Sequence, residues 1–418
     1  MEVRSRFGKL ELSRQVIYNK EEDKHVIPGN AVLPAHEGII VTRGLQEWAC
    51  LLPQDLSFAS AQRLLGWQTR DEKVLSESTL RNLVREHGEI IREAERAEVE
   101  ALLKMENLSG LEVQLVPNET PRRRAGWPEE MNEAIETALE AENIHPPKGV
   151  SVADWERVLE ARREEAARPI EELRNLGPEV AEGQVLMTTD EVLTRKPEKR
   201  RFWELRTARI VTPEGYRYLS GVGDSFLQQV LVVLLVLFST PRVRSLLLIG
   251  DGARWIRNFF TDWLAWLSDK EMILDWYHAR KKVSQLGSMI YRGRKGRKPF
   301  LGSLYRHLWH GDVDAAIAVL EAYRPHTRNE KRLDELIAYF HKRRDFIPNY
   351  RQRRCERLYI GSAHSEKAND LIVARRQKRR GMHWSLTTSD ALAALKTLML
   401  NDGWELYWQQ RQVLPLVA

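Results

Sequence analysis

The chain has 418 residues, with 65 Lys or Arg against 59 Asp or Glu and a formal net charge of +6. This length is enough for two or three domains with a sizeable core. Cys50 and Cys355 are the only cysteines and lie in no CxxC pattern, which argues against a disulfide framework and a thiolate metal site and favours a reducing cytoplasm. The longest apolar run, residues 230–238, is too short to cross a bilayer, so no membrane association is expected.

Charge is distributed unevenly along the chain. Residues 279–380 contain 26 basic and 10 acidic residues, whereas residues 93–183 contain 11 basic and 22 acidic residues. Such an asymmetry favours a polyanionic partner for the basic segment. The alternative is a solvated helical surface with no partner.

The N-terminal part divides into three predicted regions. Short alternating segments punctuated by Pro and Gly predict a small cap over residues 1–44 that is either irregular or β-rich. Residues 45–92 read as two helices, the first over 57–65 and ended by Gly66, the second capped by Ser76. With Arg81 and Arg85 on a polar face, this pair is compatible with a helix-turn-helix that reads DNA, although two packed helices without such a role are equally compatible. Residues 93–183 read as an acidic helical connector with long helices over 92–105 and 152–176.

A change of composition at Gln184 begins an α/β (α+β) region. The pattern predicts strands at 184–190, 202–212 and 216–222, a helix carrying 227–238, a strand at 243–251, a helix at 253–267 and a strand at 272–276. This is the element order of the RNase H-like fold. In that fold the first and fourth strands are neighbours, which would place Asp190 beside Asp251.

Three carboxylates have the settings that a two-metal site needs. Asp190 and Asp251 each follow an apolar strand, and Glu366 lies in a basic, helix-like segment. Hard divalent cations prefer oxygen ligands, and two such ions can clamp the attacking and leaving oxygens of a phosphoryl transfer. Glu191 could share or compete for the role of Asp190, but alternation along a strand puts the two side chains on opposite faces, which favours Asp190.

The segment 279–358, between the last strand and the Glu366 segment, reads as a basic all-helical insertion. A Gly/Lys/Arg loop in this insertion fits sequence-independent phosphate contacts, although a solvated loop is the alternative. The predicted DNA-binding residues here and in the Glu366 segment are Arg292, Arg294, Lys295, Arg297, Lys298, Arg375 and Arg376.

Several motifs together resemble the bacterial insertion-sequence DDE transposases, and the Mutator-related branch in particular. Residues 249–256 (IGDGARWI) match the second-acid motif, and an Asp-x-x-His motif, Asp275 to His278, begins 24 positions after Asp251. The glutamate motif GSAHSEK (361–367) is followed by GMHWS (381–385), and ELRTA (204–208) follows Asp190. Ala363 departs from the more usual glycine.

The resemblance implies an RNase H-like core, residues 184–278 and 359–418, around the helical insertion. It implies Asp190, Asp251 and Glu366 as catalytic ligands of two Mg²⁺ or Mn²⁺ ions, with Asp275 and His278 as supporting residues. It also implies cleavage and strand transfer at element ends, with double-stranded DNA as partner and a homodimer or larger assembly in the bacterial nucleoid. A transposase-derived DNA-binding regulator without catalysis and an RNase H-like nuclease are the alternatives.

Overall fold

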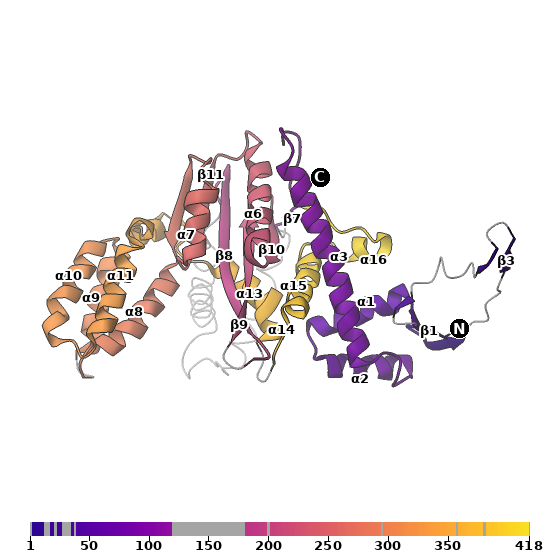
Figure 1. The fold of residues 1–418 in the computed structure, drawn as a ribbon. Helices are drawn as coiled ribbons and strands as arrows, with labels where there is room; N and C mark the ends of the chain where they lie inside the picture. The colour runs from indigo at the N-terminus through magenta and orange to yellow at the C-terminus, as the bar shows by residue number, and fades with distance from the viewer. Residues whose placement is uncertain are drawn as a thin grey trace, which may run out of the picture.

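A computed structural model describes residues 2–11, 17–20, 23–26, 35–36, 39–118, 180–198, 201–293, 296–356, 358–378 and 382–417. A central sheet lies between two helical regions (Figure 1). Helices α8–α11 lie on one side of it and helices α1–α3 on the other.

The central sheet is mixed and has the order β12-β11-β8-β9-β10-β7. Its strands are β7 (Val116–Pro117), β8 (Gln184–Arg195), β9 (Phe202–Val211), β10 (Gly215–Gly221), β11 (Ser245–Gly250) and β12 (Lys270–Leu274). β8, β11 and β12 run parallel to one another, while β9 is antiparallel to both β8 and β10. The predicted strands and the pairing of the first with the fourth are thereby confirmed.

One strand is longer than the sequence indicated. The prediction ended the first strand at Asp190, because two adjacent charges, Asp190 and Glu191, interrupt the apolar pattern. In the structure β8 continues to Arg195, and its pairing with β9 is unbroken from Leu186 to Arg195. Buried Val192 and Thr194 carry the strand beyond the charged pair.

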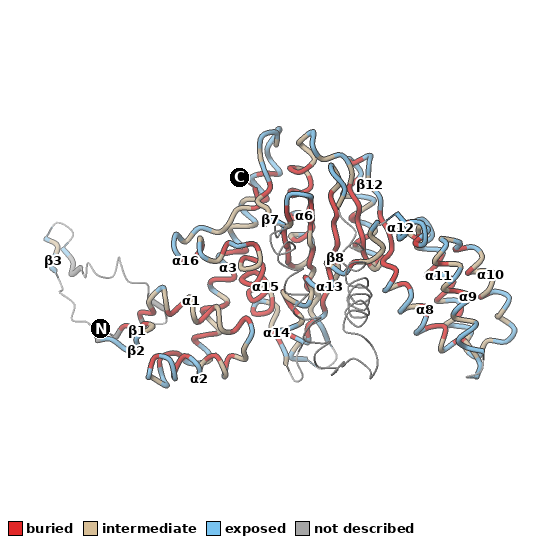
Figure 2. Tube along the Cα trace, turned by 180° about the vertical axis from the view of Figure 1, so that it is seen from behind, coloured by how far each residue is buried: buried red, intermediate tan, exposed pale blue. Residues whose placement is uncertain are grey.

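The sheet has two covered faces. Val185 and Met187 pack with α6 (Gly223–Phe238) and α7 (Arg254–Asn258) in one core. Val192 packs on the opposite face, with Ala368 of α13 (Ala363–Asn369) and Ala393 of α15 (Leu386–Leu400). Figure 2 shows the buried strands at the centre of the molecule. Within the described part of the chain, no helix is long and apolar enough to cross a membrane.

The N-terminal region combines short strands with three helices. Strands β1 (Glu2–Ser5), β2 (Gly8–Glu11), β5 (Ala35–His36) and β6 (Ile39–Val41) form one sheet, and β3 (Ile17–Asn19) pairs with β4 (Lys24–Val26), in line with the β-rich alternative predicted for the cap. The helices are α1 (Arg43–Leu51), α2 (Phe58–Thr69) and α3 (Glu77–Leu103). Ser76 caps α3 as predicted, its side chain accepting from Thr79 N at 3.1 Å.

Two helices extend beyond the bounds expected from the sequence, and each contains a glycine. Gly66 lies inside α2, which continues to Thr69. Gly88 lies inside α3, so the two helices expected on either side of it are one 27-residue helix. Both glycines permit close approach: a Cβ atom at 66 would lie 3.0 Å from Glu72 Cα, and one at 88 would collide with Ala391 of α15. The predicted helix over 152–176 lies outside the described residues.

The remaining elements are helical. The predicted insertion forms α8 (Trp276–Ile290), α9 (Arg297–Trp309), α10 (Val313–Tyr323), α11 (Glu330–His341) and α12 (Tyr350–Cys355), with a core of its own. The chain then returns to the sheet through α13, a π-helical turn at Asp370–Ala374, α14 (Arg375–Gln377), α15 and α16 (Trp404–Gln410). The helix predicted over 253–267 is shorter: α7 leads into a π-helical turn at Phe259–Trp263.

Candidate active site at the edge of the central sheet

The register of two parallel strands brings Asp190 and Asp251 together. Leu247 lies opposite Leu186, and Ile249 lies opposite Thr188. One further alternation along each strand leads to Asp251 and Asp190, which therefore lie on the same face of the sheet. They lie just beyond the point where the pairing of β8 with β11 ends, which we call the sheet edge. Burial chiefly, and the charge on the nearby Asp251 in addition, raise the pKa of Asp190.

Asp190 and Glu191 point to opposite faces, as the alternation predicted. Asp190 Oδ2 accepts a hydrogen bond of 2.7 Å from Asn369 Nδ2, at the end of α13. Glu191 Oε2 accepts one of 2.7 Å from Trp255 Nε1 in α7, on the other face. Asp190 is therefore the acid that shares a face with the helix carrying Glu366.

Glu366 lies on α13, which packs on β8 and β9. It is one turn before Asn369, but its side chain is exposed and makes no hydrogen bond or ion pair with any described residue. Among the described residues, no three His, Cys, Asp or Glu side chains are grouped so that they could hold a metal ion. The structure thus brings together two of the three predicted ligands and places the helix of the third beside them.

The surroundings of Asp190 and Glu191 disfavour the charged forms of these two carboxylates. Burial, reinforced by the charge on Asp251, raises the pKa of Asp190 to about 6, although Glu191 N donates to its Oδ1 at 2.8 Å. Burial also raises the pKa of Glu191. His278 faces both aspartates; its contact with Asp275 and these charges raise its pKa to about 9, so it is a cation at neutral pH.

Asp275 is a buried carboxylate that connects α8 to the segment before α13. Its side chain is 1% exposed and caps α8, accepting from Tyr277 N at 2.6 Å and His278 N at 3.1 Å. It also accepts from the backbone and hydroxyl of Ser362, the N-cap residue just before α13. Burial alone would raise its pKa, but the hydrogen bonds from His278 and Ser362 hold that pKa below its usual value. Asp275 therefore fixes the start of the Glu366 helix relative to β12, which is a supporting role.

Thr207 and Asn369 belong to the site but were not selected from the sequence. Thr207 lies opposite Asp190 in the β8–β9 register, and its hydroxyl donates to Asn369 Oδ1. Asn369 in turn donates to Asp190, so a chain of three side chains orients the carboxylate. Thr207 lies inside the ELRTA stretch that resembles the transposase pattern, whereas nothing local marked Asn369.

The predicted DNA-contacting residues of the N-terminal helices are partly engaged within the fold. Arg85 Nε donates to Thr388 Oγ1 at 2.7 Å, and Arg85 Nη2 donates to Ser385 Oγ at 3.4 Å, which ties α3 to the start of α15. Arg81 is half-exposed, lies over the Phe58 ring and pairs with Glu77 at 4.0 Å. Of the two, only Arg81 keeps part of its guanidinium at the surface without a hydrogen bond to α15.

The predicted basic residues of the C-terminal half differ in their exposure. Arg297 and Lys298 are exposed at the start of α9, and Arg292 is exposed just after α8, while Arg294 and Lys295 lie outside the described residues. Arg375 is exposed and pairs with Asp370 at 3.4 Å.

Arg376 is the exception. It is 3% exposed, its Nε donates to Pro53 O at 2.6 Å, and it lies over the Trp384 ring. A side chain held in this way cannot reach a phosphate unless its packing is undone, so its role in the structure is to join α14 to the N-terminal helices.

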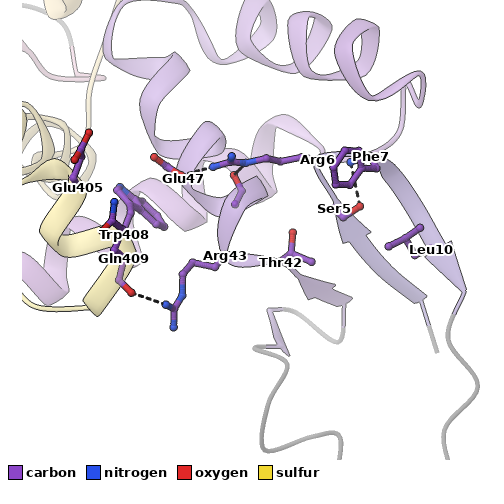
Figure 3. Close-up of a pocket in the computed structure, with 11 residues that line it drawn as sticks. Ser5, Arg6, Phe7, Leu10, Thr42, Arg43, Glu47, Glu405, Trp408 and Gln409 are labelled. Carbon is purple, nitrogen blue, oxygen red and sulfur yellow. Dashed lines mark hydrogen bonds and ion pairs between the residues drawn. The ribbon is translucent and has the colours of Figure 1, made fainter.

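A cavity of about 650 Å³ lies away from the acids, between the N-terminal strands, α1 and α16 (Figure 3). The ion pair between Arg6 and Glu47 and the hydrogen bond from Arg43 to Gln409 O lie along it. Phe7 at its rim is 89% exposed. None of the predicted catalytic residues lines this cavity.

Residues 217–410 match the model of an uncharacterised protein family (UPF0236). The matched segment begins in β10 and ends in α16, so it contains Asp251, the helical insertion and Glu366, whereas Asp190 precedes it. No curated protein matches the chain. The family's description gives no activity, so the functional assignment depends on the site itself.

Proposed function

We propose that the protein is a DDE transposase of a bacterial insertion sequence, which cleaves DNA at element ends and transfers the strand with the help of divalent metal. The observation that carries the proposal is the parallel register of β8 and β11, which sets Asp190 and Asp251 side by side on the face that α13 crosses. The sheet order, with three antiparallel strands followed by two parallel ones, supports an RNase H-like core.

The donor set suits Mg²⁺ or Mn²⁺, which prefer carboxylate oxygens. Asp190 and Asp251 would hold the ions, with Glu366 as the third ligand once its exposed side chain turns toward them. Burial chiefly, and the nearby charge on Asp251 in addition, raise the pKa of Asp190, and a bound cation would favour the charged form of both carboxylates. Two ions bound there would activate the attacking hydroxyl and stabilise the leaving oxygen.

Other residues of the chain position this set. Asn369 orients Asp190, and Asp275 fixes the start of α13 through Ser362. His278, a cation at neutral pH, limits the repulsion between the two aspartates. The basic helices would hold the DNA backbone of element ends and target, and a homodimer or larger assembly on double-stranded DNA follows from the need to bring two ends together.

The test is a joining assay. Full-length protein is incubated with Mg²⁺ or Mn²⁺ and with labelled duplexes taken from the inverted repeats that flank its gene, together with a target plasmid. Nicked ends and labelled plasmid are then measured. Asp251→Asn removes a ligand charge and should reduce both products by about 1000-fold or more, corresponding to a loss of roughly 4 kcal/mol. Binding of the same duplexes without metal should stay within about threefold, because phosphate contacts come from other residues.

Glu112→Gln is the matched control. Glu112 is an exposed carboxylate two residues before Gln114. The carbonyl of Gln114 accepts a hydrogen bond from Arg217 of β10, which lies on the side of β8 away from β11. This variant should keep wild-type activity. Cleavage without joining would instead indicate an RNase H-like nuclease, and sequence-specific binding without either product would indicate a regulator. Undiminished cleavage by Asp251→Asn would remove Asp251 from the mechanism.

A further inference from the structure

A cavity of about 370 Å³ opens beside Asp251, between the end of β11 and the helical insertion. Asp251 and His278 are among the residues that line it. Lys281 and Lys282 of α8 and Arg343, just after α11, contribute further positive charge. Lys282 is paired with Glu335 at 3.1 Å, which leaves Lys281 and Arg343 as the cations of this cavity without a carboxylate within ion-pair distance among the described residues. The cavity is therefore suited to an anion.

Arg343 is held against the turn that carries Asp251. Gly252 has φ +72°, and a Cβ atom at that position would lie 2.7 Å from Arg343 Nε and 3.1 Å from its Cδ. A side chain at position 252 would thus be strained and would also displace the arginine. The glycine next to the candidate catalytic aspartate is what allows a residue 91 positions further along the chain to reach this edge.

The guanidinium of Arg343 is not compensated by the protein. It is half-buried, lies 4.2 Å from the centroid of the Tyr339 ring, and its buried Nε has no hydrogen-bond partner. Its neighbour Arg344 is exposed and pairs with Asp314. Burial lowers the pKa of Arg343, which reflects the unfavourable free energy of placing a cation there without a partner. An anionic ligand would supply the missing partner, and phosphate matches a guanidinium with two parallel hydrogen bonds.

Resting on the function proposed above, we infer that Arg343 binds a phosphate of the DNA strand next to the bond that is cut or joined, with Lys281 as a second cation in the same cavity. The insertion then contributes to the site itself, in addition to any general attraction of its basic surface for DNA. Arg343 is separate from the exposed residues Arg292 and Lys298, because it lies against the turn after Asp251.

The experiment measures DNA binding without metal, by fluorescence anisotropy over a series of salt concentrations, with full-length wild type, Arg343→Ala, Arg343→Lys and Arg344→Ala. Loss of one bidentate phosphate contact should weaken binding by Arg343→Ala about tenfold and make the slope of log affinity against log salt shallower by about 0.9. Arg343→Lys should fall between, because lysine keeps the charge without the two-pronged geometry. Arg344→Ala should match wild type within about twofold.

A second arm locates the phosphate. Neutral methylphosphonates are placed one at a time along each strand around the cleavage point. Wild type should lose affinity at one position beside that point, and Arg343→Ala, with an unchanged melting temperature, should show no further loss there. Equal losses in both proteins at every position would overturn the inference, as would an unchanged salt slope in Arg343→Ala. A defect confined to inorganic phosphate or free nucleotide, with DNA binding intact, would also overturn it in favour of a small-anion site.

The result is separable from that of the joining assay. If the wild type cuts and joins DNA and Arg343→Ala binds DNA as the wild type does, only the phosphate contact is refuted. A wild type that neither cuts nor joins would refute the transposase proposal whatever Arg343 does. Failure of the wild type to bind DNA would refute both.

Discussion

The edge of the central sheet and the interface between α3 and α15 both gather charged residues from distant parts of the chain, but they treat them differently. At the sheet edge, Asp190 and Asp251 repel each other, and Arg343 has no carboxylate partner among the described residues. At the interface, buried Arg92 pairs with Asp390 at 2.8 Å and with Glu95 at 2.8 Å. It also donates to the carbonyl of Ser220 in β10 at 2.7 Å.

The difference indicates what each region is for. Saturated buried charges hold elements together and leave nothing for a ligand, as Asp275 does even within the sheet edge. Buried charges without a partner lower the stability of the fold, and proteins retain them where a ligand supplies the missing partner. This contrast favours the sheet edge as the proposed functional region, whereas the α3–α15 interface, where a DNA-reading helix was predicted, fastens the N-terminal helices to the sheet.

The largest expected effect is on stability at the interface. Arg92→Ala would leave Asp390 and Glu95 without their shared partner, and breaking a buried ion pair in this way destabilises by about 3–5 kcal/mol. Urea unfolding monitored by circular dichroism measures it. Arg96→Ala is the control on the same helix, since Arg96 is half-exposed in its pair with Glu89 and should contribute less than about 1 kcal/mol. If both variants lose less than about 1 kcal/mol of stability, the contrast between the buried ion pairs of the interface and the uncompensated charges of the sheet edge is refuted.

At the sheet edge, removal of a charge is expected to raise the free energy of unfolding instead of lowering it. Asp190→Asn should stabilise the metal-free protein at neutral pH by up to about 3 kcal/mol, because it removes a buried charge whose pKa is raised by about 2 units. The native carboxyl has a pKa of about 6 against 3.8 unfolded, so the native state binds more protons between these values, and wild-type stability falls as pH rises through them. Asn369 can rotate its amide to accept from the new side chain.

The advantage of Asp190→Asn should therefore be absent below about pH 4 and complete above about pH 6. Urea unfolding in EDTA at several pH values measures this profile. A variant less stable than wild type at pH 7 would show that Asp190 is a structural residue like Asp275.

The five basic residues between positions 292 and 298 are expected to act on DNA affinity alone. Replacing Arg292, Arg294, Lys295, Arg297 and Lys298 with Ala should make the salt slope shallower by roughly 2 to 4 units, since each phosphate contact contributes about 0.9. Binding should weaken equally for inverted-repeat and random duplexes, because backbone contacts carry no sequence information. Titrations at several salt concentrations measure both quantities. An unchanged slope would identify this segment as a solvated surface.

The smallest effect is expected for Arg85. Arg85→Ala removes its hydrogen bonds to Thr388 and Ser385 and should destabilise by about 0.5–1.5 kcal/mol. Discrimination between cognate and random duplexes should not change, whereas Arg81→Ala, which affects a more exposed guanidinium, is the variant that would reveal DNA reading by α3. Lost discrimination in Arg85→Ala would restore the helix-turn-helix interpretation and blur the contrast between the two regions.

Local patterns in the sequence were sufficient to locate β8, β11 and the start of α3. The apolar runs before Asp190 and Asp251 mark β8 and β11, because a strand buried on both faces needs near-continuous apolar residues. Ser76 marks the start of α3, since its side chain satisfies a free backbone donor. The alternation of Asp190 and Glu191 followed from strand geometry alone.

What only the tertiary structure decided are the contacts between residues far apart in the chain. Gly88 reads as a break until Ala391 packs against it, and Arg376 reads as a surface cation until Pro53 and Trp384 enclose it. Ser362 on Asp275 and Arg343 on the turn at Gly252 are equally invisible in any short window. A local pattern indicates which way a side chain faces. Whether a charged side chain has a partner within the protein depends on which distant segments of the chain pack beside it.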